Sequence, residues 1–185
     1  MFHNLKKFFL KYNNLFPIVG FLFGILSAKI VMILVNIGFP NKGFLGVLYF
    51  PISEEIFKFL LGVILIILLK LDYKPSILLG LAIGLGFRLT EMHLKTQTIE
   101  NFLIGTIAHA TWVCLSITGY FRYKRTNNIS HIAIILFSIM YHLGYNLFLA
   151  GKITMIHESY LVRGIILGLL VSVSLIKTYY ETCFK

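Results

Sequence analysis

The stretch Ser53-Glu54-Glu55-Ile56-Phe57-Lys58 places two adjacent carboxylates and a lysine at the start of an apolar run that extends to Leu69. The whole chain has only seven acidic residues, so two of them side by side in such a run need a physical reason. An ionised group in hydrocarbon is costly unless it is paired or hydrated. The sequence therefore predicts that other helices hold partners against this pair.

The composition excludes an ordinary water-soluble domain. Hydrophobic residues make up 58% of the 185 residues and charged residues 13%, whereas soluble domains carry roughly 25% charged residues. Several apolar runs reach the ~20 residues that are needed to cross a bilayer. We therefore predict a single integral membrane domain over residues 1–185, located in the cell membrane and surrounded by lipid.

Six apolar segments predict an all-α, polytopic bundle of about six transmembrane helices. Short polar loops, several of which contain glycine or proline, separate the segments, and no repeat or interdomain linker is present. The segments are 18–37, 51–69, 77–92, 102–121, 132–150 and 161–179. The apolar residues 44–50 are interpreted either as an interfacial segment or as an extension of the second helix.

The charge distribution predicts the orientation of the chain. A net charge of +10 could indicate nucleic-acid binding, but the basic residues cluster at segment ends, where they act as topology signals and contact anionic headgroups. With the N-terminus inside, ten lysines and arginines lie on the inner side and four on the outer side. The positive-inside rule then predicts cytoplasmic termini, and no nucleic acid is expected as a partner. The many isoleucine, lysine, asparagine and tyrosine residues favour a prokaryotic source.

Charged residues interrupt the second and third segments at helical spacing. Lys58 lies one turn from both glutamates and is expected to neutralise part of their charge, with Pro51 at the start of that helix. In the third segment, Arg88 is three residues before Glu91 and is placed to pair with it. Phe87 shares a helix face with Glu91. These spacings predict two ion pairs on neighbouring helices.

The fourth and fifth segments add imidazoles and an amide. His109 lies in the fourth segment, and His142 and Asn146 share one face of the fifth. Counted from the expected segment ends, all these polar groups lie within roughly 12 Å of the outer surface. Each alone has a plainer interpretation, as a solvated helix start, a surface ion pair or a packed histidine. Together they predict a single water-filled site that opens to the extracytoplasmic side.

Such a set of residues suits the activation of water. No serine or cysteine is paired with a base, and Cys114 and Cys183 have no metal or redox spacing. A carboxylate can act as general base on water, while imidazoles and an amide orient the water and stabilise an oxyanion. No cofactor is required by this scheme. Alternatively, zinc could supply the nucleophile, with ligands drawn from Glu55, Glu91, His109 and His142.

The ordered motifs resemble those of a known family of intramembrane proteases. The stretch from Glu54 to Lys58 resembles the EExxK motif of the PrsW family, and that from Phe87 to Glu91 resembles its FxxxE motif. His109, and His142 with Asn146, resemble the later histidine motifs. The family is distantly related to the CAAX prenyl proteases. The resemblance covers the motif-bearing core at about residues 51–150 and none of the first and last segments.

The resemblance implies a CAAX-protease-like helical core and a glutamate-dependent intramembrane endopeptidase. Glu54 would be the base, with Glu55 in support, and His109, His142 and Asn146 would orient water and stabilise the oxyanion. Lys58, Phe87 and Arg88 would support these residues. Glu91 stands where CAAX proteases have a histidine, so prenylated CAAX substrates are not implied. The implied substrates are membrane-anchored proteins or peptides, such as anti-sigma factors.

Two other functional classes fit the same residues. Proton- or ion-coupled transporters also carry charged residues and histidines inside membrane helices. A conduction path should continue inward, however, and the inner halves of these segments are nearly all aliphatic. The third class is a catalytically silent relative that binds membrane partners, as an immunity protein does.

Overall fold

The computed structural model of the protein describes residues 15–38, 44–92, 99–149 and 158–184. These residues form six long helices, and no strand occurs in this part of the chain. The helices are α2 (Leu15–Gly38), α3 (Phe44–Leu69), α4 (Tyr73–Met92), α5 (Ile99–Thr126), α6 (Ile132–Leu149) and α7 (Glu158–Phe184), with a short 3-10 helix at Ile129–His131. The prediction of an all-α bundle of about six helices is confirmed.

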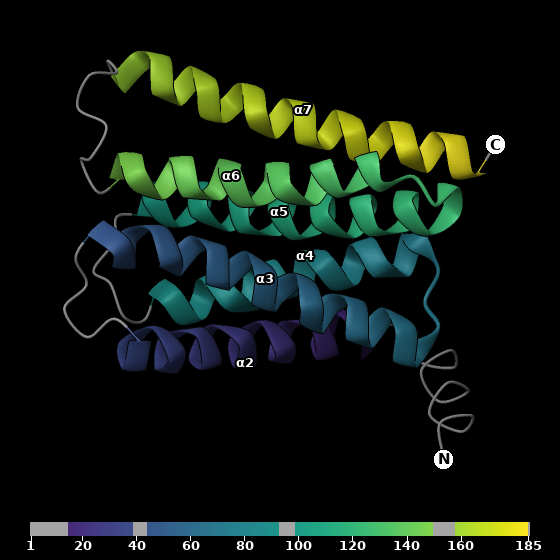
Figure 1. Cartoon of the computed structure of the whole chain (residues 1–185), viewed down its shortest axis with the longest axis horizontal. Helices are drawn as coiled ribbons and strands as arrows, with labels where there is room; N and C mark the ends of the chain where they lie inside the picture. The colour runs from purple at the N-terminus through teal and green to yellow at the C-terminus, as the bar shows by residue number, and fades with distance from the viewer. Residues whose placement is uncertain (1–14, 39–43, 93–98, 150–157, 185) are drawn as a thin grey trace.

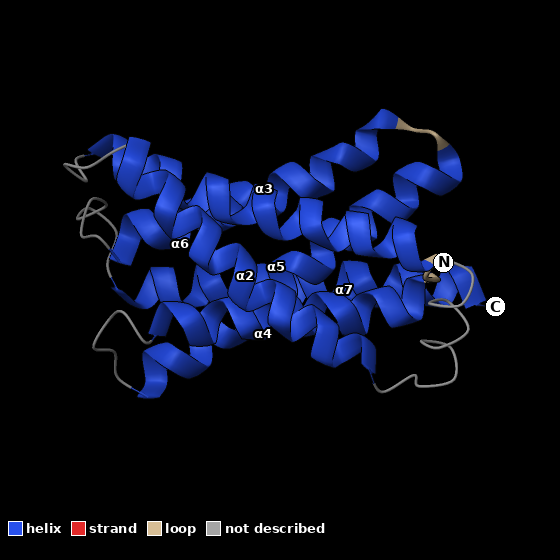
Figure 2. Ribbon diagram, turned by 90° about the horizontal axis from the view of Figure 1, so that it is seen from below, coloured by secondary structure: helices blue, strands red, loops and turns tan. Residues whose placement is uncertain are grey.

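The helices lie side by side along the long axis of the molecule (Figure 1). In this view α2 and α7 are at the two edges, and the other four helices lie between them. The start of α2 and the end of α7 are at the same end of the bundle as the α3–α4 and α5–α6 connections. Figure 2 shows the same bundle after a quarter turn, with helices in more than one layer.

Three helices are long and apolar enough to cross a membrane by length and composition. The three spans are Leu15–Gly38, Leu103–Thr126 and Ile129–Leu147. Large hydrophobic side chains are exposed on the outside of the bundle, for example Ile37 at 75% and Met140 at 63%. An apolar exterior of this kind suits lipid rather than water. These features indicate a membrane protein.

Glycines bring α2, α4 and α5 into backbone contact. A Cβ atom on Gly24 of α2 would lie 2.2 Å from the carbonyl oxygen of Ile83 in α4. A Cβ atom on Gly84 of α4 would lie 2.5 Å from the Cα atom of Ala110 in α5. Only glycine permits such close approach, as in many membrane helix pairs. These contacts hold α4 and α5 in a fixed register, which positions the polar side chains that they carry.

Helix α3 begins at Phe44, seven residues before the predicted start at Pro51. Pro51 therefore lies inside the helix, and its predicted place at the helix start is wrong. Ten residues separate Phe44 from Glu54, which is about 15 Å along the helix axis. The positive end of the helix dipole is too distant to stabilise the glutamates, because its effect fades within the first turn. The apolar residues before Pro51 extend the helix, which was one of the two interpretations of that segment.

Candidate functional site

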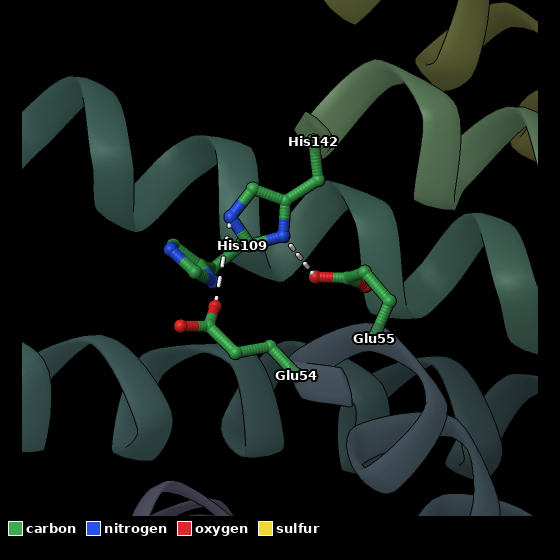
Figure 3. A group of neighbouring side chains, drawn as sticks. All are labelled: Glu54, Glu55, His109 and His142. Carbon is green, nitrogen blue, oxygen red and sulfur yellow. Dashed lines mark hydrogen bonds and ion pairs between the residues drawn. The ribbon is translucent and has the colours of Figure 1, made fainter. Parts of the chain in front are cut away.

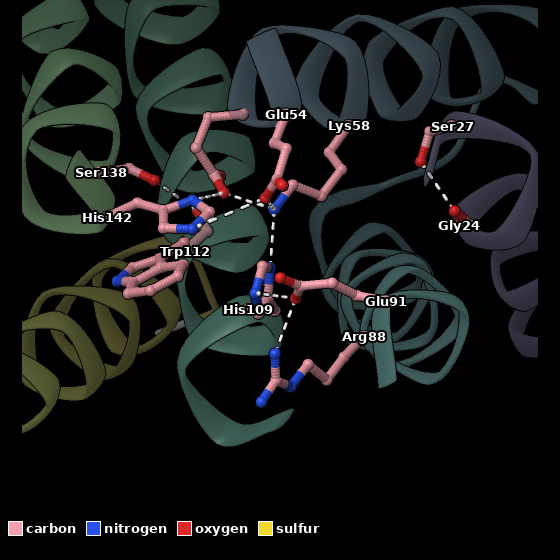
Figure 4. A network of polar contacts seen from close by, with 11 residues as sticks. Gly24, Ser27, Glu54, Lys58, Arg88, Glu91, His109, Trp112, Ser138 and His142 are labelled. Atoms are coloured by element: carbon pink, nitrogen blue, oxygen red, sulfur yellow. Dashed lines mark hydrogen bonds and ion pairs between the residues drawn. The ribbon is translucent and has the colours of Figure 1, made fainter. Parts of the chain in front are cut away.

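Charged and imidazole side chains from four helices meet inside the bundle, as Figures 3 and 4 show. We call this group the polar cluster, and its members are Glu54, Glu55 and Lys58 of α3, Arg88 and Glu91 of α4, His109 of α5 and His142 of α6. The cluster side chains on α3, α5 and α6 are at most 2% exposed. The predicted convergence of carboxylates and imidazoles is therefore present.

Glu55 fixes the orientation of His142. Its Oε1 atom accepts a hydrogen bond from Nδ1 of His142 at 2.7 Å (Figure 3) and also pairs with Lys58. An ionised carboxylate can only accept, so we assign the His142 proton to Nδ1. In the neutral ring, Nε2 is then an acceptor. That atom lies 3.6 Å from Oε2 of Glu54.

The contacts of Glu54 with His142 and Lys58 are longer than those of Glu55 with the same two residues. Its Oε2 atom lies 3.6 Å from His142 Nε2 and 4.0 Å from Lys58 Nζ, both beyond the usual length of a hydrogen bond. Polar atoms at such a separation are commonly bridged by water. A water molecule beside this pair would donate one proton to Glu54 and the other to His142. The two adjacent glutamates therefore occupy chemically different positions.

Lys58 is fully buried at the centre of the cluster. Besides its pair with Glu55, its Nζ atom lies 2.9 Å from Nδ1 of His109 and 4.3 Å from the centre of the Phe87 ring. An ammonium group only donates, so Nδ1 of His109 accepts and its proton is assigned to Nε2. That Nε2 atom lies 3.4 Å from Oε2 of Glu91. Lys58 thus neutralises a glutamate, as predicted, and also sets the tautomer of His109.

Arg88 and Glu91 extend the cluster along α4. Nη1 of Arg88 donates to Oε2 of Glu91 at 2.7 Å, as the spacing of these residues predicts. A Cβ atom on Gly105 of α5 would lie 2.5 Å from the guanidinium group, so the absence of a side chain at that position makes room for Arg88. Figure 4 shows His109 between Lys58 and Glu91. His109 therefore connects two ion pairs, Lys58 with Glu55 and Arg88 with Glu91.

Aromatic rings support both imidazoles. Trp112 of α5 stacks on His142 with ring centres 4.1 Å apart, and Phe87 stacks on His109 at 5.5 Å. The carbonyl oxygen of Trp112 accepts a hydrogen bond from Ser138 of α6 at 3.0 Å, which links the two helices. Sequence reasoning singled out Phe87 but missed Trp112 and Ser138. Trp112 is the single tryptophan of the chain and lies one turn after His109, and this position could have indicated its role.

Asn146 is on α6, one turn beyond His142, and is half-buried. Its spacing places it on the same helix face as His142. Within the described residues its side chain forms no hydrogen bond, so its amide could donate to another molecule. Its predicted part in oxyanion stabilisation stays a prediction.

The cluster lies deeper and is more enclosed than predicted. His109 is ten residues from the start of α5 at Ile99, a distance of about 15 Å along the helix axis. Glu54 lies at the same distance from the start of α3. The expected depth was smaller because both helices begin earlier than the apolar segments indicate. The cluster residues on α3, α5 and α6 are closed off from solvent in this structure, so they do not line an open, water-filled site.

The cluster contains a donor set that could hold a metal ion. One donor atom from each of four residues lies within 4.8 Å of the others, and these residues are Glu54, Glu55, His109 and His142. The set of zinc ligands predicted from the sequence contained Glu91 instead of Glu54. Carboxylate and imidazole donors suit zinc. However, Lys58 already pairs with Glu55 and His109, so a metal ion does not fit while Lys58 keeps its position.

The chain was compared with protein families, curated proteins and solved structures. No family model matches it, and no curated protein or solved structure matches it either. The resemblance to the PrsW family therefore rests on the ordered motifs, and a CAAX-protease-like core stays a prediction.

Proposed function

We propose that this protein is an intramembrane endopeptidase of the PrsW type, which hydrolyses membrane-anchored proteins or peptides with water activated by Glu54. The observation that supports it most is the placement of Glu54 against Nε2 of His142, whose ring is oriented by Glu55. In this proposal all six helices cross the cell membrane of a prokaryote, with both termini cytoplasmic. The end of the bundle nearer the cluster faces the extracytoplasmic side.

Glu54 and His142 act together on the attacking water. A water that donates one proton to each acceptor presents its remaining lone pairs to the carbonyl carbon of the substrate. Glu54 takes the proton as the new C–O bond forms. When the intermediate collapses, the C–N bond breaks and this proton passes to the leaving amine. Glu55 stabilises any positive charge that develops on His142 through the 2.7 Å hydrogen bond.

The oxyanion of the tetrahedral intermediate requires a hydrogen-bond donor. The amide of Asn146 is the proposed donor, because it lies one turn from His142 and is half-buried. His109 has a different role from the one the resemblance implies. Both its nitrogens face cluster residues, Lys58 and Glu91, so we assign it as a positioning residue.

Lys58 favours a mechanism that uses no metal ion. Its ammonium group supplies positive charge at the place where the donor atoms of Glu55 and His109 converge. Displacing it would leave a long charged side chain to be accommodated elsewhere in an apolar bundle. No step in the proposed mechanism depends on a metal.

Hydrolysis of single-pass transmembrane peptides by the purified protein in liposomes tests the proposal. We expect cleavage by the wild-type protein and a loss of about 10²- to 10⁴-fold in rate for Glu54→Gln. Glu181→Gln is the matched control, because Glu181 is an exposed residue of α7 that pairs with Lys177. Cleavage by Glu54→Gln at the wild-type rate would show that the proposal is wrong. An ion flux that Glu54→Gln abolishes, without any cleavage, would favour the transporter class.

A further inference from the structure

Lys29 projects from an exposed and otherwise aliphatic face of α2. We call this surface the Lys29 face, and it consists of Ile18, Leu22, Leu26, Lys29, Ile33 and Ile37. The five aliphatic side chains are between 46% and 75% exposed. Helix α2 is also one of the candidate membrane spans. A cation therefore stands in the middle of a surface that otherwise suits lipid.

The opposite face of α2 is occupied by α4. A Cβ atom on Gly20 would lie 2.8 Å from the carbonyl oxygen of Leu79, and one on Gly24 would lie 2.2 Å from that of Ile83. Rotation of α2 to bury Lys29 would bring larger side chains against a backbone that only glycine can approach. The Lys29 face is therefore fixed toward the outside of the bundle.

Neither headgroup layer is within reach of the Lys29 ammonium group. Nine residues separate Lys29 from Gly38 and fourteen separate it from Leu15, which is about 14 Å and about 21 Å of helix axis. The lysine side chain is roughly 6 Å long. It also leaves a helix toward the N-terminal end, which is the more distant end here. The charge therefore stays in hydrocarbon, where it needs a partner.

The chain offers Lys29 no spare carboxylate at this depth. Three of the seven acidic residues belong to the polar cluster, which already holds Lys58 and Arg88. The other four lie at or near helix ends, and they are Asp72, Glu100, Glu158 and Glu181. Among the described residues, none forms an ion pair with Lys29. The partner must come from another molecule.

We propose that the Lys29 face binds the transmembrane helix of another membrane protein that carries an aspartate or glutamate at the depth of Lys29. Charge complementarity selects the carboxylate, and the flanking isoleucines and leucines contact the rest of that helix. A second copy of α2 does not fit, because α2 has no acidic residue and a symmetric contact would oppose two lysines. The inference requires only that α2 spans the membrane, so it does not depend on protease activity.

Photo-cross-linking to designed helices tests this proposal. A photoreactive residue is placed at position 33 of the full-length protein, which is reconstituted with a single-pass leucine–alanine helix that carries one central glutamate. A matched helix carries glutamine instead. We expect about fivefold more cross-linking to the glutamate helix, the factor that an interhelical polar contact typically gives. The same photoreactive residue at position 170, where exposed Leu170 of α7 lies, should show no preference.

Two substitutions distinguish the effect of the Lys29 charge from the effect of the aliphatic side chains around it. Lys29→Leu should abolish the preference for the glutamate helix, whereas Lys29→Arg should keep it. Both replace an exposed side chain, and unchanged thermal unfolding checks that both variants fold. Equal cross-linking of the two helices at position 33, which is also expected if Lys29 contacts lipid phosphates, would overturn the proposal. A glutamate preference that persists in Lys29→Leu would overturn it as well.

Discussion

Nδ1 of His142 lies 2.7 Å from Oε1 of Glu55, and this hydrogen bond directs the other ring nitrogen toward Glu54. The two glutamates are adjacent in the chain, yet their surroundings differ. Glu55 is held by two donors on one oxygen, whereas the contacts of Glu54 with His142 and Lys58 are 3.6 and 4.0 Å long. Glu55 is thereby suited to orient His142, and Glu54 is suited to act on water.

Removal of Lys58 should destabilise the protein strongly. Lys58→Met leaves Glu55 as a buried charge without its cation, which typically costs about 3–5 kcal/mol of unfolding free energy. Lys177→Met is the matched control, because Lys177 is 73% exposed and exposed pairs contribute at most about 1 kcal/mol. Unfolding in mixed detergent micelles measures both variants.

A double variant shows whether the loss comes from the unpaired charge. Glu55→Gln combined with Lys58→Met removes both charges, so the double variant should be more stable than Lys58→Met alone. If the losses of unfolding free energy of the two single variants are additive in the double variant, the ion pair of Lys58 with Glu55 does not stabilise the protein.

Gly105→Ala should disturb the network through Arg88. A methyl group at this position would overlap the guanidinium group at 2.5 Å and displace it from Glu91, which contacts His109. We expect peptide cleavage to fall by about 10- to 100-fold, the usual effect of misplaced active-site groups. Gly144→Ala is the control, because a Cβ atom there meets nothing within 4 Å. Equal rates in the two variants would show that Arg88 does not position the site.

Local spacing was enough to predict much of the cluster. The ion pairs of Lys58 with Glu55 and of Arg88 with Glu91 follow from residues three apart on a helix. Their meeting with His109 and His142 follows from the high cost of isolated polar groups in apolar helices. The number of helices follows from the number of apolar segments, because polar loops with glycine or proline separate one segment from the next.

Interhelical packing decided the features that spacing could not predict. The stacking of Trp112 on His142 and the direction of each nitrogen of His109 depend on how α3, α4, α5 and α6 meet. The start of α3 was misplaced because proline is common at helix starts. Here the apolar residues before Pro51 continue the helix through the proline instead.

Gly24→Ala should weaken the contact of α2 with α4. Its methyl group would lie 2.2 Å from the backbone oxygen of Ile83, so the two helices must separate. We expect a loss of about 1–3 kcal/mol of unfolding free energy, as for other overpacked contacts. Gly38→Ala, where a Cβ atom meets nothing within 4 Å, should cause no such loss. Matching stabilities of the two variants in mixed micelles would contradict the backbone contact described for α2 and α4.

Metal chelators should leave peptide cleavage unchanged. Lys58 pairs with two of the four residues that could bind a metal ion, and its ammonium group already supplies positive charge among them. Cleavage is measured with and without a zinc chelator, and the zinc content of the purified protein is determined in parallel. Activity that the chelator abolishes and added zinc restores would require Lys58 to leave the cluster and would contradict the metal-free mechanism.

The most direct test of Glu54 as the base is peptide cleavage in water enriched with oxygen-18. We predict that the wild-type protein and Glu181→Gln both release a product with one labelled oxygen in its new carboxylate, whereas Glu54→Gln releases almost none in the same time. Labelled product from Glu54→Gln at the wild-type rate would contradict the account, and so would cleavage by the wild-type protein without incorporation of the label.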